Sequence, residues 1–182
     1  GNEEPEPSGP PSTRAGSDGT EPSASPPPKG WHRVDEPRLT VAFGLPDGWV
    51  RQPASAIQST WHAPDGAHAL SVKRDTTYGS TARAASTGQL AWYRRPAESS
   101  MDGLEVVTHT TRQNGRDAIW LEIDYHYVGQ SEPRKRVEVF VAGKAGHVYQ
   151  LLLDTTATRG HLAGQGRLFT TARSHLLIDT TP

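Results

Sequence analysis

The sequence predicts an α+β domain in which an antiparallel sheet of about six to seven strands packs with two main helices. Three observations predict this class. Residues 104–156 contain four runs rich in Val, Ile, Leu, Tyr, Trp and Thr, a composition typical of strands. Turns that contain glycine separate these runs, which favours antiparallel neighbours. Two segments with apolar residues at helical spacing, 81–95 and 161–176, flank the four runs.

The first thirty residues differ in composition from the rest of the chain. They contain eight of the fifteen prolines and no Leu, Ile, Val, Phe, Tyr or Trp. Such a segment has no apolar surface to offset its ordering entropy, so we expect residues 1–30 to form a disordered Pro/Ser/Glu-rich stalk or linker. An ordinary flexible terminus is the alternative that composition leaves open. Residues 31–182 are long enough for one domain with its own core.

Charge and composition exclude several functions. The formal net charge of −1 argues against nucleic acid or an anionic membrane as a partner. Without cysteine, neither disulfides nor thiolate metal sites can form. The sequence contains no apolar run of membrane-spanning length, so any membrane attachment is expected only through an upstream anchor. No cofactor motif is present, and we predict no cofactor.

In order along the chain, residues 39–43 alternate apolar and polar positions and are predicted as the first strand. Pro46-Asp47-Gly48 has the chemistry of a tight turn. Residues 59–75 are predicted to form a hairpin around Pro64-Asp65-Gly66.

Two histidines in this hairpin are candidate metal ligands. If Ala63 faces Ala67 across the turn, His62 lies opposite His68, and directly opposed residues have Cβ atoms roughly 5 Å apart. That separation would allow the imidazoles to share a metal ion. Zinc needs four ligands, or three and a water, so two histidines supply half a site. A solvated hairpin edge is the alternative interpretation.

Residues 81–95 are predicted as the first helix, because they carry an apolar stripe at helical spacing. Gly88 lowers its helix propensity by about 1 kcal/mol relative to alanine, and Pro96 is expected to end it. A second helix is predicted over 161–176, followed by a short strand at Leu177-Ile178. The predicted buried stripes are Ala82, Ala85, Gln89, Trp92 and Tyr93 in the first helix and Leu168, Phe169, Ala172 and Leu176 in the second.

The turn Asn114-Gly115 fixes the register of the first two strands of the four-strand meander, because a type I′ turn requires positive φ at both positions. The predicted core-facing pairs are Thr110 with Ile119, Thr108 with Leu121, and Val106 with Ile123. In the later strands, one predicted face carries Val137, Val139 and Val141, and one face of the final strand carries Tyr149, Leu151 and Leu153.

The opposite face of the first two strands gathers titratable residues: His109 beside Trp120, Glu105 beside Asp124, with Glu122 and His126 on the same side. Carboxylates and imidazoles on one face are candidates for general acid–base catalysis. A solvated sheet face produces the same pattern, and this interpretation is favoured. Arg134-Lys135-Arg136 alternates between faces, so we expect it to protect an edge or to be solvated.

The order of elements and its anchor residues resemble the PsbP-like fold as used in actinobacterial exported proteins. The matching residues are Trp31, Val34, Pro37, Leu45-Pro46-Asp47-Gly48-Trp49, Pro64-Asp65-Gly66, Leu70, Val72, Gly115-Arg116-Asp117-Ala118, Val148-Tyr149 and Leu168-Phe169. The resemblance covers residues 31–178. It is similar to the extracytoplasmic C-terminal domain of membrane-anchored actinobacterial Ser/Thr protein kinases and to related LpqN-like lipoproteins.

This resemblance implies a non-catalytic cell-surface domain that binds an unidentified ligand or protein of the cell envelope. In a kinase, such an ectodomain would report binding inward as a sensor. The chain itself lacks the glycine-rich phosphate loop, His-Arg-Asp and Asp-Phe-Gly elements of a kinase. The alternatives are a free-standing lipoprotein that acts as an assembly or accessory factor, and a metal-binding module that uses His62 and His68. The family provides no catalytic or ligand-binding residue to carry over.

Overall fold

The computed structural model of the protein describes residues 26–158 and 160–181. Most of the predicted stalk, residues 1–25, lies outside the described residues. The first strand begins at Trp31, and the Gly30 carbonyl just before it accepts a hydrogen bond from the Asp47 amide (2.8 Å).

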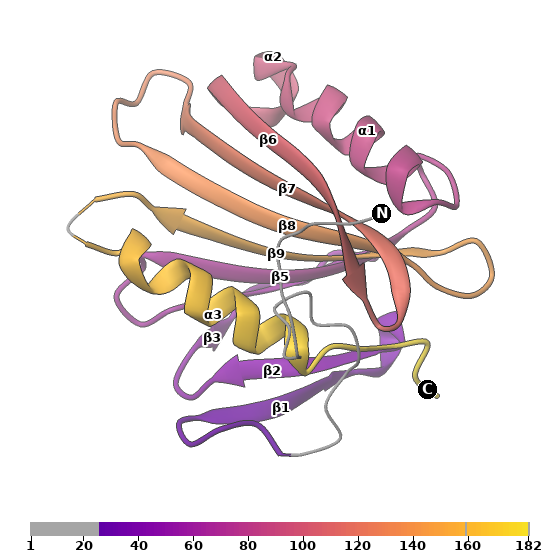
Figure 1. Cartoon of the computed structure of the whole chain (residues 1–182). Helices are drawn as coiled ribbons and strands as arrows, with labels where there is room; N and C mark the ends of the chain where they lie inside the picture. The colour runs from indigo at the N-terminus through magenta and orange to yellow at the C-terminus, as the bar shows by residue number, and fades with distance from the viewer. Residues whose placement is uncertain (1–25, 159, 182) are drawn as a thin grey trace.

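Two antiparallel sheets make up the fold (Figure 1). The large sheet contains, in spatial order, β3 (Val50–Arg51), β4 (Gln58–His62), β5 (His68–Asp75), β9 (Val148–Thr156), β8 (Arg134–Ala142), β7 (Arg116–Tyr127) and β6 (Met101–Gln113). The small sheet contains β1 (Trp31–Glu36), β2 (Val41–Pro46) and β10 (Leu177–Ile178). The helical elements are η1 (Pro37–Leu39), α1 (Ala82–Tyr93), α2 (Pro96–Ser99) and α3 (Leu162–Ser174). The predicted α+β class and the seven-stranded antiparallel sheet are confirmed.

The β6–β7 hairpin has the predicted turn and register. Asn114 and Gly115 have φ values of 53° and 72°, as a type I′ turn requires. Thr110 therefore lies opposite Ile119, Thr108 opposite Leu121 and Val106 opposite Ile123.

The face of the large sheet that we call the α3 face is sealed by α3 and the small sheet. Its central side chains, Val139 and Leu151, are fully buried, as is Phe169 of α3. In Figure 1, α3 runs beside the small sheet, while α1 lies at the β6–β8 end of the molecule. The small sheet contributes Phe43, which is fully buried in the same cluster.

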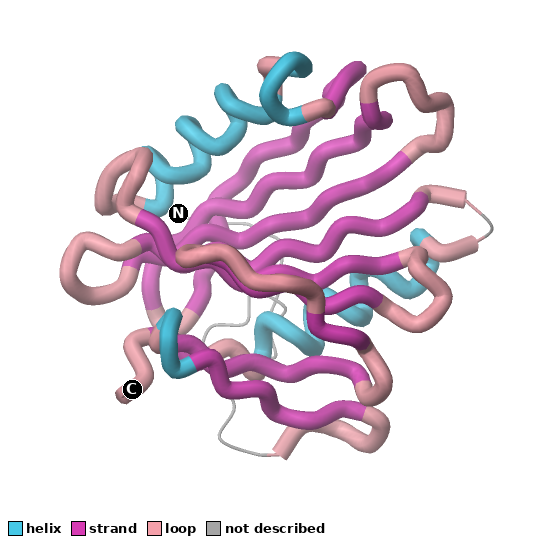
Figure 2. Tube along the Cα trace, turned by 180° about the vertical axis from the view of Figure 1, so that it is seen from behind, coloured by secondary structure: helices cyan, strands magenta, loops and turns pink. Residues whose placement is uncertain are grey.

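The other face, called the α1 face, has a helix over only part of its area. Ala82, Ala85 and Tyr93 of α1 pack in one cluster with Ile119 and Leu121 of β7. Seen from behind, α1 crosses one end of the sheet and the strands below it carry no helix on that side (Figure 2). The α1 face is therefore divided into a covered apolar half and an uncovered half.

Three local features differ from the expectations: strand β1, the position of Leu39 and the packing of Trp120. Strand β1 was not anticipated, and Leu39 lies in η1 rather than in a strand, although its side chain is buried as expected. Pro96 follows the end of α1, as expected, and begins the short helix α2. The face that carries Trp120 is not simply solvated, because this ring packs edge-on against Phe169 with centroids 5.2 Å apart. Within residues 26–158 and 160–181, no helix has the length and apolar character needed to cross a bilayer.

Candidate functional site

The uncovered half of the α1 face is hollowed into a cavity of about 560 Å³, which we call the groove. Its floor is formed by β4, β5, β9 and β8, and its wall by α1 and the loop that precedes it. Cavities of roughly 300–1,000 Å³ are typical of small-molecule sites. The groove therefore has the size of a ligand-binding site.

The register of the strands explains why the floor is polar. Lys73 lies beside Gln150 across β5 and β9. One step along the same face, Ser71 lies beside Leu152, and beyond it Ala69 lies beside Asp154. Side chains alternate between the faces of a strand, so polar residues at every second position collect on one face. The same strands present Leu70, Val72, Leu151 and Leu153 to the core on the α3 face.

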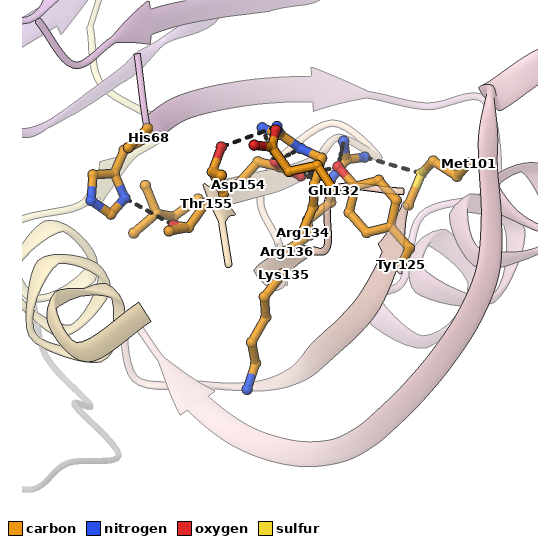
Figure 3. A network of polar contacts seen from close by, with 12 residues as sticks. His68, Met101, Tyr125, Glu132, Arg134, Lys135, Arg136, Asp154 and Thr155 are labelled. Carbon is orange, nitrogen blue, oxygen red and sulfur yellow. Dashed lines mark hydrogen bonds and ion pairs between the residues drawn. The ribbon is translucent and has the colours of Figure 1, made fainter. Parts of the chain in front are cut away.

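Two arginines of β8 hold one buried carboxylate at the end of the groove (Figure 3). Arg134 donates from Nε and Nη2 to Oδ1 of Asp154 at 2.9 and 2.8 Å, and Arg136 donates from Nε to Oδ2 at 2.8 Å. The Tyr125 hydroxyl donates to the same Oδ2. Burial lowers the pKa of both guanidinium groups, but neighbouring negative charge, including that of Asp154, outweighs it and raises both. The two arginines therefore stay charged.

Glu138 lies on β8 under the groove and is completely buried. Its Oε1 accepts a hydrogen bond from the Gln150 amide, and within the described part of the chain its Oε2 has no hydrogen-bond partner. Burial raises the pKa of this carboxyl to about 7, although the charges of Arg136 and Lys73 oppose the shift. Glu138 therefore changes charge near neutral pH without being exposed to solvent.

The wall of the groove is aromatic and amide-bearing. Gln89 of α1 accepts a hydrogen bond from Lys73 Nζ at 2.7 Å. Tyr78 packs against Gly88, where an added Cβ would lie 2.4 Å from the ring. The half-buried Trp92 extends the wall. Gly88, which weakens the helix by propensity, is thus the position that lets Tyr78 line the groove.

The interpretation of Arg134-Lys135-Arg136 as edge protection was wrong, because β8 lies between β9 and β7 in the sheet interior. The alternation itself is confirmed. Arg134 and Arg136 line the groove, whereas Lys135 points the opposite way (Figure 3) and pairs with Glu122 at 3.1 Å.

The predicted opposition of His62 and His68 was also wrong. His62 pairs with Ala69, and the Ala63 amide bonds the His68 carbonyl at 2.9 Å, so the register is shifted by one residue. A shift of one residue sends the two side chains to opposite faces. His62 lines the groove, while His68 stacks on Trp49 (centroids 5.9 Å apart) on the other side. The two imidazoles therefore cannot share a metal ion.

The other titratable candidates do not form a site together. Glu105 lies opposite Asp124 and His109 opposite Trp120, as expected. His126, however, is six residues further along β7 than Trp120, a separation of roughly 20 Å. In the described ranges, no group of three or more His, Asp or Glu side chains is placed to hold a metal ion.

Sequence reasoning missed the groove residues Lys73, Gln150, Asp154 and Glu138. A signal was present: Gln150 and Asp154 interrupt an otherwise apolar strand on one face, and Arg134, Arg136 and Glu138 do the same in β8. Using it required knowing that β5 lies beside β9, two strands that are more than seventy residues apart in the chain.

Comparison with known proteins shows the fold. No family model matches the sequence, and no curated protein matches it. Among solved structures, cyanobacterial PsbP (CyanoP) from Synechocystis sp. PCC 6803 is similar, with a TM-score of 0.61 and 16% identity over 82% of this chain and 92% of that chain. The Ran-binding protein Mog1p of Saccharomyces cerevisiae gives a TM-score of 0.58 at 9% identity, covering 83% and 96%. The chain therefore has a PsbP-like fold, as the sequence analysis expected.

Proposed function

We propose that this protein is a non-catalytic domain of the cell surface that binds a ligand of the cell envelope in the groove. The observation that carries the proposal is the uncovered polar half of the α1 face. A sheet interior normally keeps charged side chains out unless they are paired or used. Here Lys73 is bonded to Gln89 and the two arginines to Asp154, and all three cations still border a cavity of ligand size instead of lying in a sealed core.

Glu138 is the residue that could argue for catalysis, because perturbed carboxyls are common in active sites. General acid–base catalysis requires hydrogen-bond contact with the substrate. Glu138 has no exposed surface and is bonded to Gln150, so it can alter the charge beneath the groove but cannot reach a bound molecule. This geometry favours binding over chemistry.

The cellular setting that we propose is the ectodomain of a membrane-anchored Ser/Thr protein kinase, with a free-standing lipoprotein as the alternative. The stalk-like composition of residues 1–30 and the PsbP-like fold support an exported domain held away from a surface. The sequence that precedes Gly1 in the gene product discriminates the two. A single apolar span preceded by kinase motifs supports the kinase, and a lipobox cysteine supports the lipoprotein.

The binding proposal is tested by amide chemical-shift mapping of the isotope-labelled protein during titration with soluble glycan and peptide fragments of an actinobacterial cell envelope. We expect shifts to concentrate on β4, β5, β9 and the groove side of α1. Shifts confined to other surfaces, or none at all, would contradict the proposal. The blocking variant is Ala69→Trp. Ala69 is half-buried in the floor and its side chain makes no hydrogen bond, so the substitution fills the groove without removing a polar contact.

A further inference from the structure

The positive charge that lines the groove exceeds the negative charge. Lys73, Arg134 and Arg136 line it, and Asp154 is the carboxylate among the lining residues described. Asp154 is shared between the two arginines, so one negative charge meets two positive ones at this end. Outside the lining, Asp75 lies 3.8 Å from Lys73, Glu132 lies 3.9 Å from Arg134, and the buried carboxyl of Glu138 faces Arg136 and Lys73 from below. An anionic ligand group at the arginine end would give the two guanidinium groups a second charged partner beside Asp154.

The arginine end also has donor capacity to spare. The hydrogen-bond partner of Arg136 Nη1 is the Met101 sulfur at 3.5 Å, and a thioether is a weak acceptor. Arg134 uses one bond from Nη1, to Thr156 Oγ1 at 3.2 Å, and keeps a second N–H on that nitrogen. Guanidinium groups bind carboxylates and phosphates through paired N–H donors. The site can therefore receive an acid group without first losing a strong internal bond.

The rest of the groove offers neutral groups that both donate and accept. Gln58, Gln89 and Gln150 supply amides, and Thr60 and Ser71 supply hydroxyls, which bond each other at 2.7 Å. Amides and hydroxyls pair with ligand hydroxyl groups in either direction. A ligand that carries several hydroxyls on a ring has the chemistry that this floor matches.

The aromatic wall supplies the third element. Trp92 and Tyr78 are both half-buried, so part of each side chain stays available to a ligand beside α1. Aromatic side chains of this kind combine an apolar body with a polar end. The C–H face of a sugar ring packs on such a surface while its hydroxyls reach the floor.

We propose, on the basis of the binding function inferred above, that the groove takes an acidic saccharide, a sugar whose carboxylate or phosphate lies at Arg134 and Arg136. The sugar ring lies between the wall and the amide-bearing floor. The acid group supplies the charge that Asp154 alone does not.

The proposal is tested with glucuronic acid, glucose 6-phosphate and glucose, with binding followed by amide chemical shifts. We expect both acidic sugars to shift groove amides and to bind at least about tenfold more tightly than glucose, the gain typical of one charge-assisted hydrogen bond. Arg134→Gln should remove this preference and leave glucose unchanged. Trp92→Ala should weaken all three. Arg112→Gln, which removes an equal charge from the exposed β6–β7 hairpin end, should have no effect.

Equal binding of glucose and glucuronic acid, or no binding of either acidic sugar, overturns the proposal. Tighter binding of the acidic dipeptide glycyl-glutamate than of glucuronic acid also overturns it, because then the ring plays no part. These results leave the proposed function intact if envelope fragments still shift groove amides. If neither the sugars nor the fragments shift them, both proposals fail.

Discussion

The two faces of the large sheet are made from the same strands but have different roles. On the α3 face, alternate residues of β5, β8 and β9 are Val and Leu, and α3 with the small sheet seals them. On the α1 face, the intervening residues of the same strands include Lys73, Glu138 and Asp154, and this part of the sheet borders the groove. The difference shows that the residues at alternate positions of a strand decide which face of the sheet can be sealed. One face can therefore provide stability while the other binds a ligand.

The largest loss of stability that tests this division is expected for Phe169→Ala in α3. Phe169 is fully buried on the sealed face, and removing such a ring costs about 3–5 kcal/mol. Denaturant unfolding should show this loss, while envelope fragments should still shift groove amides under native conditions. Loss of groove binding in a folded variant would contradict the division between the two faces.

Asp154→Ala should cost roughly 3 kcal/mol, because it leaves two guanidinium groups near each other without their shared carboxylate. Arg134 is 18% exposed and Arg136 14%, so solvent moderates the penalty. Asp154→Asn is the matched variant and should lose less, since it keeps one oxygen acceptor. Equal unfolding free energies for wild type and Asp154→Ala would mean that the ion pairs contribute nothing.

Glu138→Gln tests the contrast between the two faces through the pH dependence of the unfolding free energy. The folded pKa of Glu138 is raised from 4.5 to about 7, so its stabilising contribution is complete below pH 4.5 and is lost as pH rises through 7. The glutamine variant lacks this loss and should be more stable than wild type by on the order of 3 kcal/mol at pH 8. Unfolding curves at pH 5 and pH 8 measure it. A difference between the two proteins that does not grow with pH would refute the assignment.

Gly88→Ala should have the smallest effect on stability. Alanine gains about 1 kcal/mol of helix propensity, but its Cβ would lie 2.4 Å from the Tyr78 ring and 2.6 Å from the Tyr78 Cβ. Such overpacking costs about 1–3 kcal/mol, so the net effect should be a small loss of stability. Gly164→Ala in α3 is the control, because nothing lies within 4 Å of its added Cβ, and it should raise the unfolding free energy. If Gly88→Ala stabilises as much as Gly164→Ala, Tyr78 is not held against the helix.

Local chemistry predicted much of the fold. Asn114-Gly115 fixed the register of nine residue pairs, from Gln113 with Arg116 to Glu105 with Asp124, because it allows one turn geometry. Pro64-Asp65-Gly66 did not, since it fits loops of different length. Asp65 Oδ1 accepts from the Ala67 amide at 2.9 Å and Gly66 takes a φ of 74°, which places Ala67 within the turn. That one-residue difference separates His62 from His68.

The groove could not be predicted in the same way, because it depends on contacts between distant segments. Arg134 and Arg136 resemble edge residues until β9 is known to lie on one side of β8 and β7 on the other. The pairing of β5 with β9 then brings Lys73 beside Gln150. Hairpin signals are local, whereas this pairing closes a long loop and leaves no short motif.

The most direct measurement compares ligand binding after a block is placed on each of two surfaces. Saturation-transfer spectra of soluble envelope fragments would be recorded with wild type, with Ala69→Trp in the groove, and with Val107→Trp, whose side chain is 56% exposed on the edge strand β6. We predict that the ligand signal disappears with Ala69→Trp and persists with Val107→Trp. An equal signal from all three folded proteins would contradict the claim that the groove is the binding site.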